Sequence, residues 1–446
     1  MLSGSKRILR FTGILHGSWR SQLIHPCEAW YKSSMHAAGS LVPLLWQTPL
    51  DLALLRGTPF NCLVIDPASQ PPAESAVAAA RRTGFDVVSI ADAPASILSD
   101  CTWPRVDAGG KDGAASGPTG LPWIESNGWR VRLARAKDAT RPVWVRHGGL
   151  PEKTALPLSG AAYALAVADA AAHGGAWIVE LDSALRRGLA AGEPACLSKW
   201  RELAAAASFF NRHAGWAAMR PQAALGVISD FAGENEFIAT ELLNLLARRQ
   251  VGYRIVTAQR ASQADLNGLS ALLYAARLAP PREVLGLFTA FARAGGLCVL
   301  PAAASSIVPS GIVEEQNHAG FDVRGWGQGR IAVAKQDWDD PYTAARDVHM
   351  LMSRRRDHLH LFNASSINTY ATDGASGMPA LVHLLNYSLR KPAAPITLAV
   401  RKRYRQARLW TLGSNGSTAL GMAAEAEWLE IPLPPFSVYA AVELSA

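Results

Sequence analysis

Short runs of alternating apolar and polar residues fill the C-terminal part of the chain. Gly, Pro, Ser or Asn separates most of these runs, as expected for short antiparallel strands joined by turns. The pattern predicts an antiparallel β-sandwich over residues 379–446. Its strands are expected at residues 380–387, 396–404, 407–412, 427–433 and 437–444.

Strand and helix signals alternate in the middle of the chain. This alternation is typical of a doubly wound sheet with helices on both faces. We therefore predict a Rossmann-like or flavodoxin-like α/β domain over residues 213–345, with its ligand crevice at the carboxyl ends of the strands. Strands are expected at residues 224–230, 251–257, 269–274 and 297–301, and helices at 236–249 and 281–294.

The N-terminal part repeats a strand-helix-strand pattern. One apolar run ends at Asp66, a helix is expected at residues 74–82, and a second apolar run ends at Asp92. This is the βαβ signature of a parallel sheet. A (β/α)8 barrel takes about 250 residues and rarely fewer than about 200. Further strands are expected at residues 130–134, 142–146 and 176–181, a helix at 160–172 and a flexible loop at 107–120.

The fold class predicted from these patterns is α/β and multidomain. The chain has 446 residues, and a single core stops growing at roughly 250–300 residues. We predict a reduced or degenerate (β/α) barrel over residues 1–212, then the α/β domain, a connecting segment at 346–378, and the β-sandwich.

The net charge of +8 does not indicate a nucleic-acid-binding protein. The densest basic groups are the triplets at residues 354–356 and 401–403, and neither has interleaved aromatic residues. Isolated charge runs are usually solvated, so we expect no nucleic-acid partner.

The five cysteines form no zinc or redox spacing, and their number is odd. Cys62 and Cys298 lie in apolar runs, where a thiol behaves as a small hydrophobe. This usage favours a reducing compartment. Residues 1–19 lack a continuous apolar signal segment, and no run approaches the roughly 20 apolar residues of a membrane span. We expect a soluble, cytoplasmic protein without a membrane partner, or a secreted one if the start is misassigned.

No cofactor and no metal site are expected. Neither α/β unit has a Gly-Xaa-Gly-Xaa-Xaa-Gly sequence after its first strand, and no Walker lysine is present. The Gly-rich residues 325–330 precede no predicted helix. The histidines that we considered as ligands form no convincing set, and the alternating pair is expected on a polar surface. They are His16, His25, His36 and the pair His358 and His360.

The middle of the chain resembles a known family. Residues 290–294 with Gly295-Gly296-Leu297-Cys298-Val299-Leu300, the stretch 325–333 and Asp340-Pro341-Tyr342 are similar to the glutamine-amidotransferase-like domain of family 42 β-galactosidases and related glycoside hydrolases. In that family a barrel precedes this domain and a β-domain follows it, which is the order predicted here. The resemblance covers the chain from about residue 160 to its end. It implies a carbohydrate substrate or ligand and self-association, as trimers.

The chain departs from this family in two places. A working amidotransferase has a cysteine after its central strand, whereas residues 272–277 contain none. The galactosidase barrel presents an Asn-Glu pair, but the Asn235-Glu236 pair of this chain falls at a helix start in the α/β domain, where Glu is favoured by the helix dipole. Glutamine hydrolysis is therefore not expected, and the resemblance does not identify the acid pair.

The segment Trp123-Ile124-Glu125-Ser126-Asn127-Gly128-Trp129 is the first candidate site. Indole rings stack on sugars, while carboxylates and amides bind hydroxyl groups. Glu125 is therefore a candidate catalytic carboxylate, and Trp123, Asn127 and Trp129 are candidate substrate contacts. The segment fits a surface turn with two packing tryptophans equally well.

The strand at residues 176–181 ends in a second candidate site. Glycosidic cleavage requires one acid and one carboxylate, and a barrel presents them at the carboxyl ends of its strands. Glu180 and Asp182 are candidate catalytic residues, and Trp177 is a candidate sugar contact. Asp182 also fits a helix N-cap.

Four further residues at strand ends are candidate substrate contacts. Asp66 and Asp92 could bind sugar hydroxyls, or they could terminate their strands next to Pro67 and Pro94. Arg146 and His147 could supply a cation or a proton donor, although a lone histidine is usually structural.

Two hypotheses follow from these patterns. The first is a glycoside-hydrolase-like enzyme in which Glu125 and either Glu180 or Asp182 form the carboxylate pair. The second is a non-catalytic carbohydrate-binding or assembly protein with a degenerate hydrolase barrel. The short first domain and the missing Asn-Glu pair favour the second.

Overall fold

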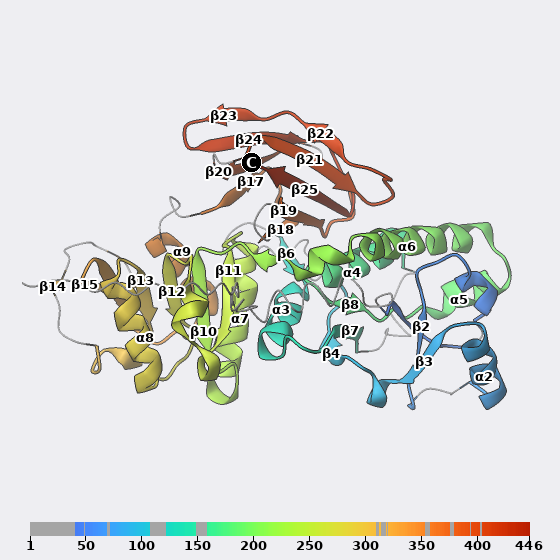
Figure 1. Cartoon of the computed structure of the whole chain (residues 1–446), viewed down its shortest axis with the longest axis horizontal. Helices are drawn as coiled ribbons and strands as arrows, with labels where there is room; N and C mark the ends of the chain where they lie inside the picture. The colour runs from blue at the N-terminus through green and yellow to red at the C-terminus, as the bar shows by residue number, and fades with distance from the viewer. Residues whose placement is uncertain are drawn as a thin grey trace, which may run out of the picture. The chain divides into compact units, whose positions relative to one another are not determined.

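The computed structural model describes most of the chain after residue 40 (Figure 1). The described residues are 41–48, 50–68, 72–107, 122–148, 158–308, 312–313, 318, 320–352, 357–374, 379–392, 394–401 and 404–446. They belong to one compact unit, Ser40–Ala446. The expected loop from residue 108 onward, the basic triplet 354–356, residues 402 and 403, and Cys27, His16, His25 and His36 lie outside these ranges.

The N-terminal sheet is parallel and is built from two three-stranded sheets, β1-β2-β3 and β4-β7-β8. A parallel bridge between Leu44 and Val179 joins them, with Leu45 N donating to Val179 O at 2.8 Å. Among the described residues β3 and β4 do not pair, so this sheet is not a closed barrel. Its strands are β1 (Pro43–Leu45), β2 (Cys62–Ile65), β3 (Asp86–Ser89), β4 (Ser96–Cys101), β7 (Val143–His147) and β8 (Ala176–Trp177).

The two faces of this sheet have separate cores, because side chains alternate between faces along a strand. Leu45, Val64, Trp144 and Ile178 pack together on what we call the inner face. The opposite, outer face contacts helices and includes Val145. The helices of this region are α2 (Glu74–Arg82), α4 (Gly160–Ala171), α5 (Ser183–Ala190) and α6 (Pro194–Arg212).

Helix α4 is apolar on nearly every side, because it is buried between two cores. Tyr163 and Ala166 face the N-terminal sheet, whereas Leu165 and Ala168 pack against residues of the β-sandwich. Ser159 begins the helix, since its side chain accepts a hydrogen bond from Ala162 N at 3.1 Å.

The strand expected at residues 130–134 is wrong: these residues lie in helix α3 (Gly128–Lys137). Val131 packs in the core of the N-terminal sheet, while Leu133 packs in the core of the seven-stranded sheet described below. Because the helix is buried on two sides, its apolar residues are two apart and imitate a strand. Just before it, β5 (Arg105–Asp107) and β6 (Trp123–Glu125) form an antiparallel pair.

The middle of the chain forms a seven-stranded sheet of order β11-β10-β12-β13-β16-β15-β14. The strands β11, β10, β12, β13 and β16 are parallel to one another. Helices cover both faces of the sheet, as predicted. The Gly-rich stretch forms the turn between β15 and β16, so it does not cradle a phosphate. The elements are β10 (Leu225–Ser229), α7 (Glu236–Arg248), β11 (Tyr253–Thr257), β12 (Ala271–Tyr274), α8 (Arg282–Arg293), β13 (Leu297–Leu300), β14 (Ile312–Val313), β15 (Phe321–Trp326), β16 (Gly329–Ala334) and α9 (Pro341–Met352).

The C-terminal region is an antiparallel sandwich of two sheets, β17-β20-β24-β23 and β22-β21-β25-β19-β18-β9, around one apolar core. Its strands are β9 (Arg220–Pro221), β17 (Leu359–Phe362), β18 (Ile367–Asp373), β19 (Ala380–Asn386), β20 (Ile396–Arg401), β21 (Gln406–Thr411), β22 (Thr418–Leu420), β23 (Ala423–Glu425), β24 (Trp428–Leu433) and β25 (Tyr439–Ser445).

Two of these strands, β17 and β18, fall in the segment that we expected to connect two domains. Leu359 and Leu361 are buried in the sandwich core, and β18 pairs with β19 along six residues of its length, from Ile367 to Thr372. In β17 Leu359 and Leu361 face the sandwich core, while His360 and the exposed Phe362 lie on the other face. His360 is not simply exposed: its ring lies 4.8 Å from that of Trp428. No helix among the described residues is long and apolar enough to span a membrane.

Candidate functional site

Three charged side chains meet at the carboxyl ends of the strands of the N-terminal sheet. Asp66 follows β2, Arg146 is in β7, and Glu180 follows β8. All three continue the inner face, since each lies two residues beyond an inner-face residue: Val64, Trp144 and Ile178. We call Asp66, Arg146 and Glu180 the edge cluster. It caps the apolar inner face at the end of the sheet where barrel enzymes place their active sites.

The edge cluster holds its two carboxyl groups in different environments. Arg146 Nη2 donates to Asp66 Oδ2, and Asp66 Oδ1 accepts from Ala68 N at 2.9 Å. Burial alone would raise the pKa of Asp66, but these hydrogen bonds and the Arg146 charge lower it. Burial raises the pKa of Glu180, and the nearby Asp66 charge adds to this effect while Arg146 opposes it. The site therefore makes the Asp66 carboxyl more acidic than usual and the Glu180 carboxyl less acidic.

Several polar atoms of this region have no protein partner among the described residues. They are Glu180 Oε2, Arg146 Nε and Arg186 Nε, and all three are buried. A buried polar group without a partner costs about 1–3 kcal/mol. These three atoms therefore have hydrogen-bonding capacity that the described residues do not use.

Asp182 is the N-cap of α5 rather than a member of the edge cluster. Its Oδ1 accepts from Leu185 N at 2.8 Å, and its Oδ2 accepts from the Tyr163 hydroxyl at 3.0 Å. The Tyr163 hydroxyl in turn accepts from Asp182 N at 2.8 Å. Both carboxylate oxygens are thus occupied in holding the turn after β8 against α4.

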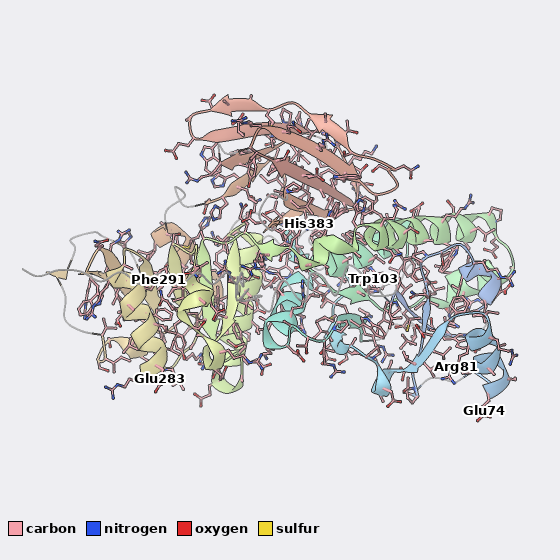
Figure 2. The ribbon with its side chains drawn as sticks, in the orientation of Figure 1. Glu74, Arg81, Trp103, Glu283, Phe291 and His383 are labelled. Carbon is pink, nitrogen blue, oxygen red and sulfur yellow. The ribbon has the colours of Figure 1, made fainter. Side chains whose placement is uncertain are left out.

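The aromatic residues near the edge cluster are buried on the outer face. Trp103, labelled in Figure 2, lies edge-on to Trp177, Tyr163 and His147 at centroid distances of 5.4, 5.4 and 5.8 Å. Trp177 is only 3% exposed. Trp177 directly precedes Ile178, and His147 directly follows Arg146. Because successive side chains of a strand point to opposite faces, Trp177 and His147 point away from Glu180 and Arg146.

Glu125 lies in a different part of the fold from the edge cluster. It ends β6 and pairs with Arg105 of β5, with Oε2 and Nε 3.3 Å apart. Trp123 of the same strand lies under the Arg248 guanidinium, whose carbon is 4.1 Å from the ring centroid. Glu125 and Trp123 therefore each contact an arginine of the protein itself. The structure does not place Glu125 next to Glu180.

Asn127 is a fully buried structural residue and not part of a surface turn. Its side chain donates to Thr102 O at 2.9 Å and to Asp169 Oδ2 at 3.1 Å, and it accepts from Thr102 N at 3.1 Å. Gly128 is required by close packing, since a Cβ there would lie 2.3 Å from the His173 ring. Trp129 is half-buried against the core of the seven-stranded sheet.

Asp92 is exposed at the end of a short 3-10 turn, Ile90–Asp92, after β3. It forms no ion pair or hydrogen bond with the edge cluster. It lies three residues beyond the end of β3 at Ser89, so it does not itself end the strand.

The sequence did not indicate Tyr163, Trp103 and Arg186 as neighbours of the edge cluster. Tyr163 is the single aromatic residue in an Ala-rich helix. This unusual position could have indicated that Tyr163 has a specific role. Arg186 Nη1 donates to Thr48 O at 2.7 Å, which connects α5 to the residues after β1. Nothing in the sequence around Trp103 indicated its position, because that position depends on contacts with three different elements.

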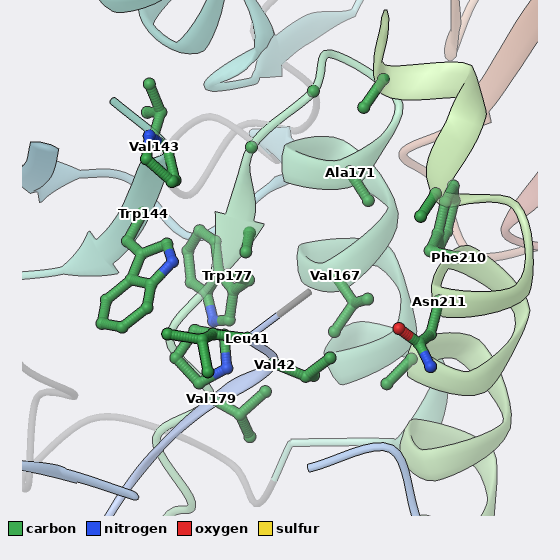
Figure 3. Close-up of a pocket in the computed structure, with 18 of the residues that line it drawn as sticks. Leu41, Val42, Val143, Trp144, Val167, Ala171, Trp177, Val179, Phe210 and Asn211 are labelled. Carbon is green, nitrogen blue, oxygen red and sulfur yellow. The ribbon is translucent and has the colours of Figure 1, made fainter. Parts of the chain in front are cut away.

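A largely apolar cavity of about 330 Å³ lies at the opposite, amino ends of the same strands (Figure 3). Val143, Trp177, Val167 and Phe210 are among its walls, together with the start of β1. It contains none of the three charged residues of the edge cluster. The two ends of the N-terminal sheet therefore differ in character: His213 and His383 line the otherwise largely apolar cavity, whereas the carboxyl ends bring together an arginine and two carboxyl groups.

No metal or thiol chemistry is supported by the described residues. No group of three His, Cys, Asp or Glu side chains in the described ranges could hold a metal ion. Cys62 and Cys298 are fully buried. Burial raises the pKa of the Cys62 thiol to about 12 and raises that of Cys298 as well. Both thiols therefore stay protonated, as predicted for small hydrophobes.

The chain is similar in structure to glycoside hydrolases. An α-L-fucosidase isoenzyme 2 from Paenibacillus thiaminolyticus has a TM-score of 0.53 and 11% identity, with 88% of this chain and 78% of that protein covered. A β-galactosidase from Bacillus circulans sp. alkalophilus has a TM-score of 0.50 and 8% identity. This likeness covers 86% of the chain but only 63% of that galactosidase.

No protein-family model and no curated protein sequence matches the chain. At these identities the structural likeness shows the fold alone. The chain therefore has a glycoside-hydrolase-like, multidomain α/β fold, as the resemblance implied.

Proposed function

We propose that this protein cleaves a glycosidic bond at the edge cluster, with Glu180 as the general acid and Asp66 as the nucleophile or base. The observation that carries the proposal is the opposite effect of the site on its two carboxyl groups. The pKa of Asp66 is lowered and that of Glu180 is raised, although both lie beside Arg146. Pairs of titratable groups with diverging pKa values are how hydrolases assign acid and base roles.

In this mechanism each residue of the edge cluster has one task. Glu180 donates its proton to the leaving oxygen as the bond to the sugar breaks. Asp66 stays ionised because of Arg146, and it attacks the anomeric carbon or activates a water molecule there. Arg146 holds the Asp66 carboxylate in position through the hydrogen bond from its Nη2 atom. In this mechanism Asp66 and Glu180 form the carboxylate pair. The pair expected from the sequence was Glu125 with either Glu180 or Asp182.

We also propose that the N-terminal sheet is a reduced barrel and that the seven-stranded sheet is an amidotransferase-like domain without amidotransferase activity. Residues Ala275 and Ala276 follow β12, where a nucleophilic cysteine would be needed. Asn235 and Glu236 lie at the start of α7, where Asn235 binds the Asp230 carboxylate at 3.1 Å. Neither position contributes to the edge cluster.

The test is hydrolysis of a panel of nitrophenyl glycosides and natural oligosaccharides by the wild-type protein and three variants. Glu180→Gln and Asp66→Asn should each lower turnover by about 10²–10⁴-fold, the usual contribution of such groups. Glu125→Gln is the matched control and should retain turnover within about twofold. An activated aryl leaving group needs little protonation, so it should rescue Glu180→Gln more than Asp66→Asn.

One observation favours a second function, the non-catalytic binding of carbohydrate. Both oxygens of Asp66 already accept hydrogen bonds, from Arg146 and Ala68, as in a site built for binding. This function predicts no turnover across the panel, with saturable sugar binding by calorimetry that Asp66→Asn weakens. Turnover lost in Glu125→Gln but kept in Glu180→Gln would contradict the edge cluster as the site.

A further inference from the structure

A cavity of about 320 Å³ with both polar and apolar walls lies where the seven-stranded sheet region meets the β-sandwich, and no residue of the edge cluster lines it. Its walls come from the end of α7, from α9, from the residues around β6 and from β17 and the start of β18. Small-molecule sites have volumes of about 300–1,000 Å³, so this cavity suits a ligand of roughly monosaccharide size. Four basic side chains line it: Arg248, Arg249, His349 and His360.

Aromatic rings hold both guanidinium groups in place. The Arg248 carbon lies 4.1 Å from the Trp123 ring centroid, and that side chain also donates to Pro122 O at 2.9 Å. The Arg249 carbon lies 5.1 Å from the Tyr342 ring centroid. A guanidinium stacked on a ring keeps its N–H edge available for planar recognition of an oxyanion.

The positive charge of the cavity is not balanced by nearby acids. No carboxylate of the described residues lies within 4 Å of the Arg248 or Arg249 guanidinium. Glu241 acts on Arg248 and Asp347 acts on Arg249 without forming an ion pair with it, and Asp347 is paired with Arg346 at 2.7 Å.

The remaining acid of the cavity region is already flanked by two imidazoles. The buried Asp357 carboxylate lies 3.1 Å from His349 Nε2 and 3.6 Å from His360 Nε2. It is therefore not directed at the arginines.

Basic residues at the end of a helix are common, because they complement the helix dipole. Such residues are normally exposed, as Arg293 is at the end of α8, where it covers the Trp326 ring at 5.2 Å. Arg248 and Arg249 are instead half-buried in the wall of a cavity, and burial lowers the pKa of both. Burying two like charges side by side is unfavourable unless an anion compensates them.

We propose that this cavity binds a small anion of monosaccharide size, recognised through a carboxylate, sulfate or phosphate group by Arg248 and Arg249. Neutral groups of the wall, including Tyr342 and Asn368, would contact the rest of the ligand. The site is separate from the edge cluster and does not depend on glycosidase activity.

Calorimetry with the full chain tests this site, using inorganic sulfate, inorganic phosphate and glucuronate as probes and glucose as the neutral comparison. We expect saturable binding of at least one anion and none of glucose. Arg248→Gln and Arg249→Gln should each weaken that binding at least tenfold. Arg293→Gln has the same charge change at the same helix position and should bind as tightly as the wild type. A preference for glucuronate would identify a carboxylate site, and a preference for sulfate or phosphate a tetrahedral one.

Three results would overturn the proposal: no saturable anion binding, full binding by the Arg248→Gln/Arg249→Gln double variant, or equal loss in Arg293→Gln. The last would mean that only net charge matters. Circular dichroism and Arg248→Lys, which keeps the charge but loses the planar fork, separate misfolding from loss of recognition. Glu180→Gln should bind the anion normally, which keeps this test independent of the proposed hydrolysis.

Discussion

Two groups of polar residues in the same compact unit show opposite designs. In what we call the Asp169 network, Asp169 accepts from Asn127 N at 2.8 Å, from Asn127 Nδ2 at 3.1 Å and from the Tyr387 hydroxyl at 2.6 Å. Thr102 completes it through Asn127. In the edge cluster, by contrast, Glu180 Oε2 and Arg146 Nε have no protein partner among the described residues.

Burial alone therefore does not identify a functional polar residue. The Asp169 network joins α3 and α4 to strand β19 of the sandwich, and every hydrogen-bonding atom in it is used within the protein. Polar groups of this kind stabilise one arrangement of elements. The edge cluster retains polar atoms without a hydrogen-bond partner among the described residues, at the carboxyl ends of the strands. This arrangement suits a ligand site.

The largest expected effect that separates the two regions is acid sensitivity. Burial lowers the pKa of His173 and of His383, each to about 3, from an ordinary value of 6.5. Between these values the unfolded chain binds more protons, so stability is lost as pH falls below about 6.5. Burial raises the pKa of Asp169 to about 6, so this group gains stability over the lower part of the same window.

Two histidines outweigh one carboxyl group, so unfolding should become easier by about 4 kcal/mol between pH 7 and pH 4, at 1.36 kcal/mol per pKa unit. Chemical denaturation at several pH values measures this change. His383→Gln in β19 should flatten the curve, whereas Glu180→Gln should steepen it, because the raised pKa of Glu180 offsets part of the loss on acidification. An equally steep curve in His383→Gln would contradict this assignment.

Next in size is the loss of the Asn127 amide. Asn127→Ala leaves Thr102 N and O without this partner and removes one donor from Asp169, so we expect a loss of about 2–3 kcal/mol in the free energy of unfolding. The matched change at the edge is Gln47→Ala, which removes one bond, from Leu181 N to Gln47 Oε1 at 3.2 Å. It should cost about 1 kcal/mol or less. Equal losses in urea denaturation would remove the distinction between the two regions.

Two glycines provide a smaller contrast. Gly128→Ala places a Cβ 2.3 Å from the buried His173 ring, and overpacking of this kind costs about 1–3 kcal/mol. The gain in helix propensity, about 1 kcal/mol, offsets part of this cost. Gly148→Ala beside the edge cluster meets only Ser99 O at 3.6 Å and should change stability by less than about 0.5 kcal/mol. Thermal melting of both variants measures the difference.

The smallest expected effect is a change in the shape of the pH profile of turnover. Arg146 lowers the pKa of both Asp66 and Glu180. Arg146→Met should therefore move the acid limb and the alkaline limb of the kcat/KM profile to higher pH. Arg105→Met removes the partner of Glu125 and should leave the profile unchanged. A profile that moves only in Arg105→Met would place the site in the β5-β6 hairpin.

The sequence predicted helices well where one apolar stripe faces a single core, and strands well where a continuous apolar run is buried on both faces. The helices α2, α7 and α8 and the strands β10, β13 and β19 lie within a few residues of their expected positions. Prediction failed for α3, whose apolar residues face two cores. It also missed β17, whose four residues give too little pattern to be distinguished, and the seven-residue strand β18.

The candidate site was anticipated in its residue types but not in its grouping. Asp66, Arg146 and Glu180 were each recognised as strand-end residues, and the structure brings them together. Glu125, Trp123 and Trp129 had an equally suggestive local sequence, but their side chains are used in packing and in an ion pair.

The sequence by itself determined the alternation of strands and helices, the order of the sheets and the positions at which charged residues end strands. These depend on hydrophobic periodicity, which is local. Only the tertiary structure decided which carboxylates share an environment, because strand pairing such as that of Leu44 with Val179 connects residues far apart in the chain. Partners at such distances set burial and charge, and these in turn distinguish the Asp169 network from the edge cluster.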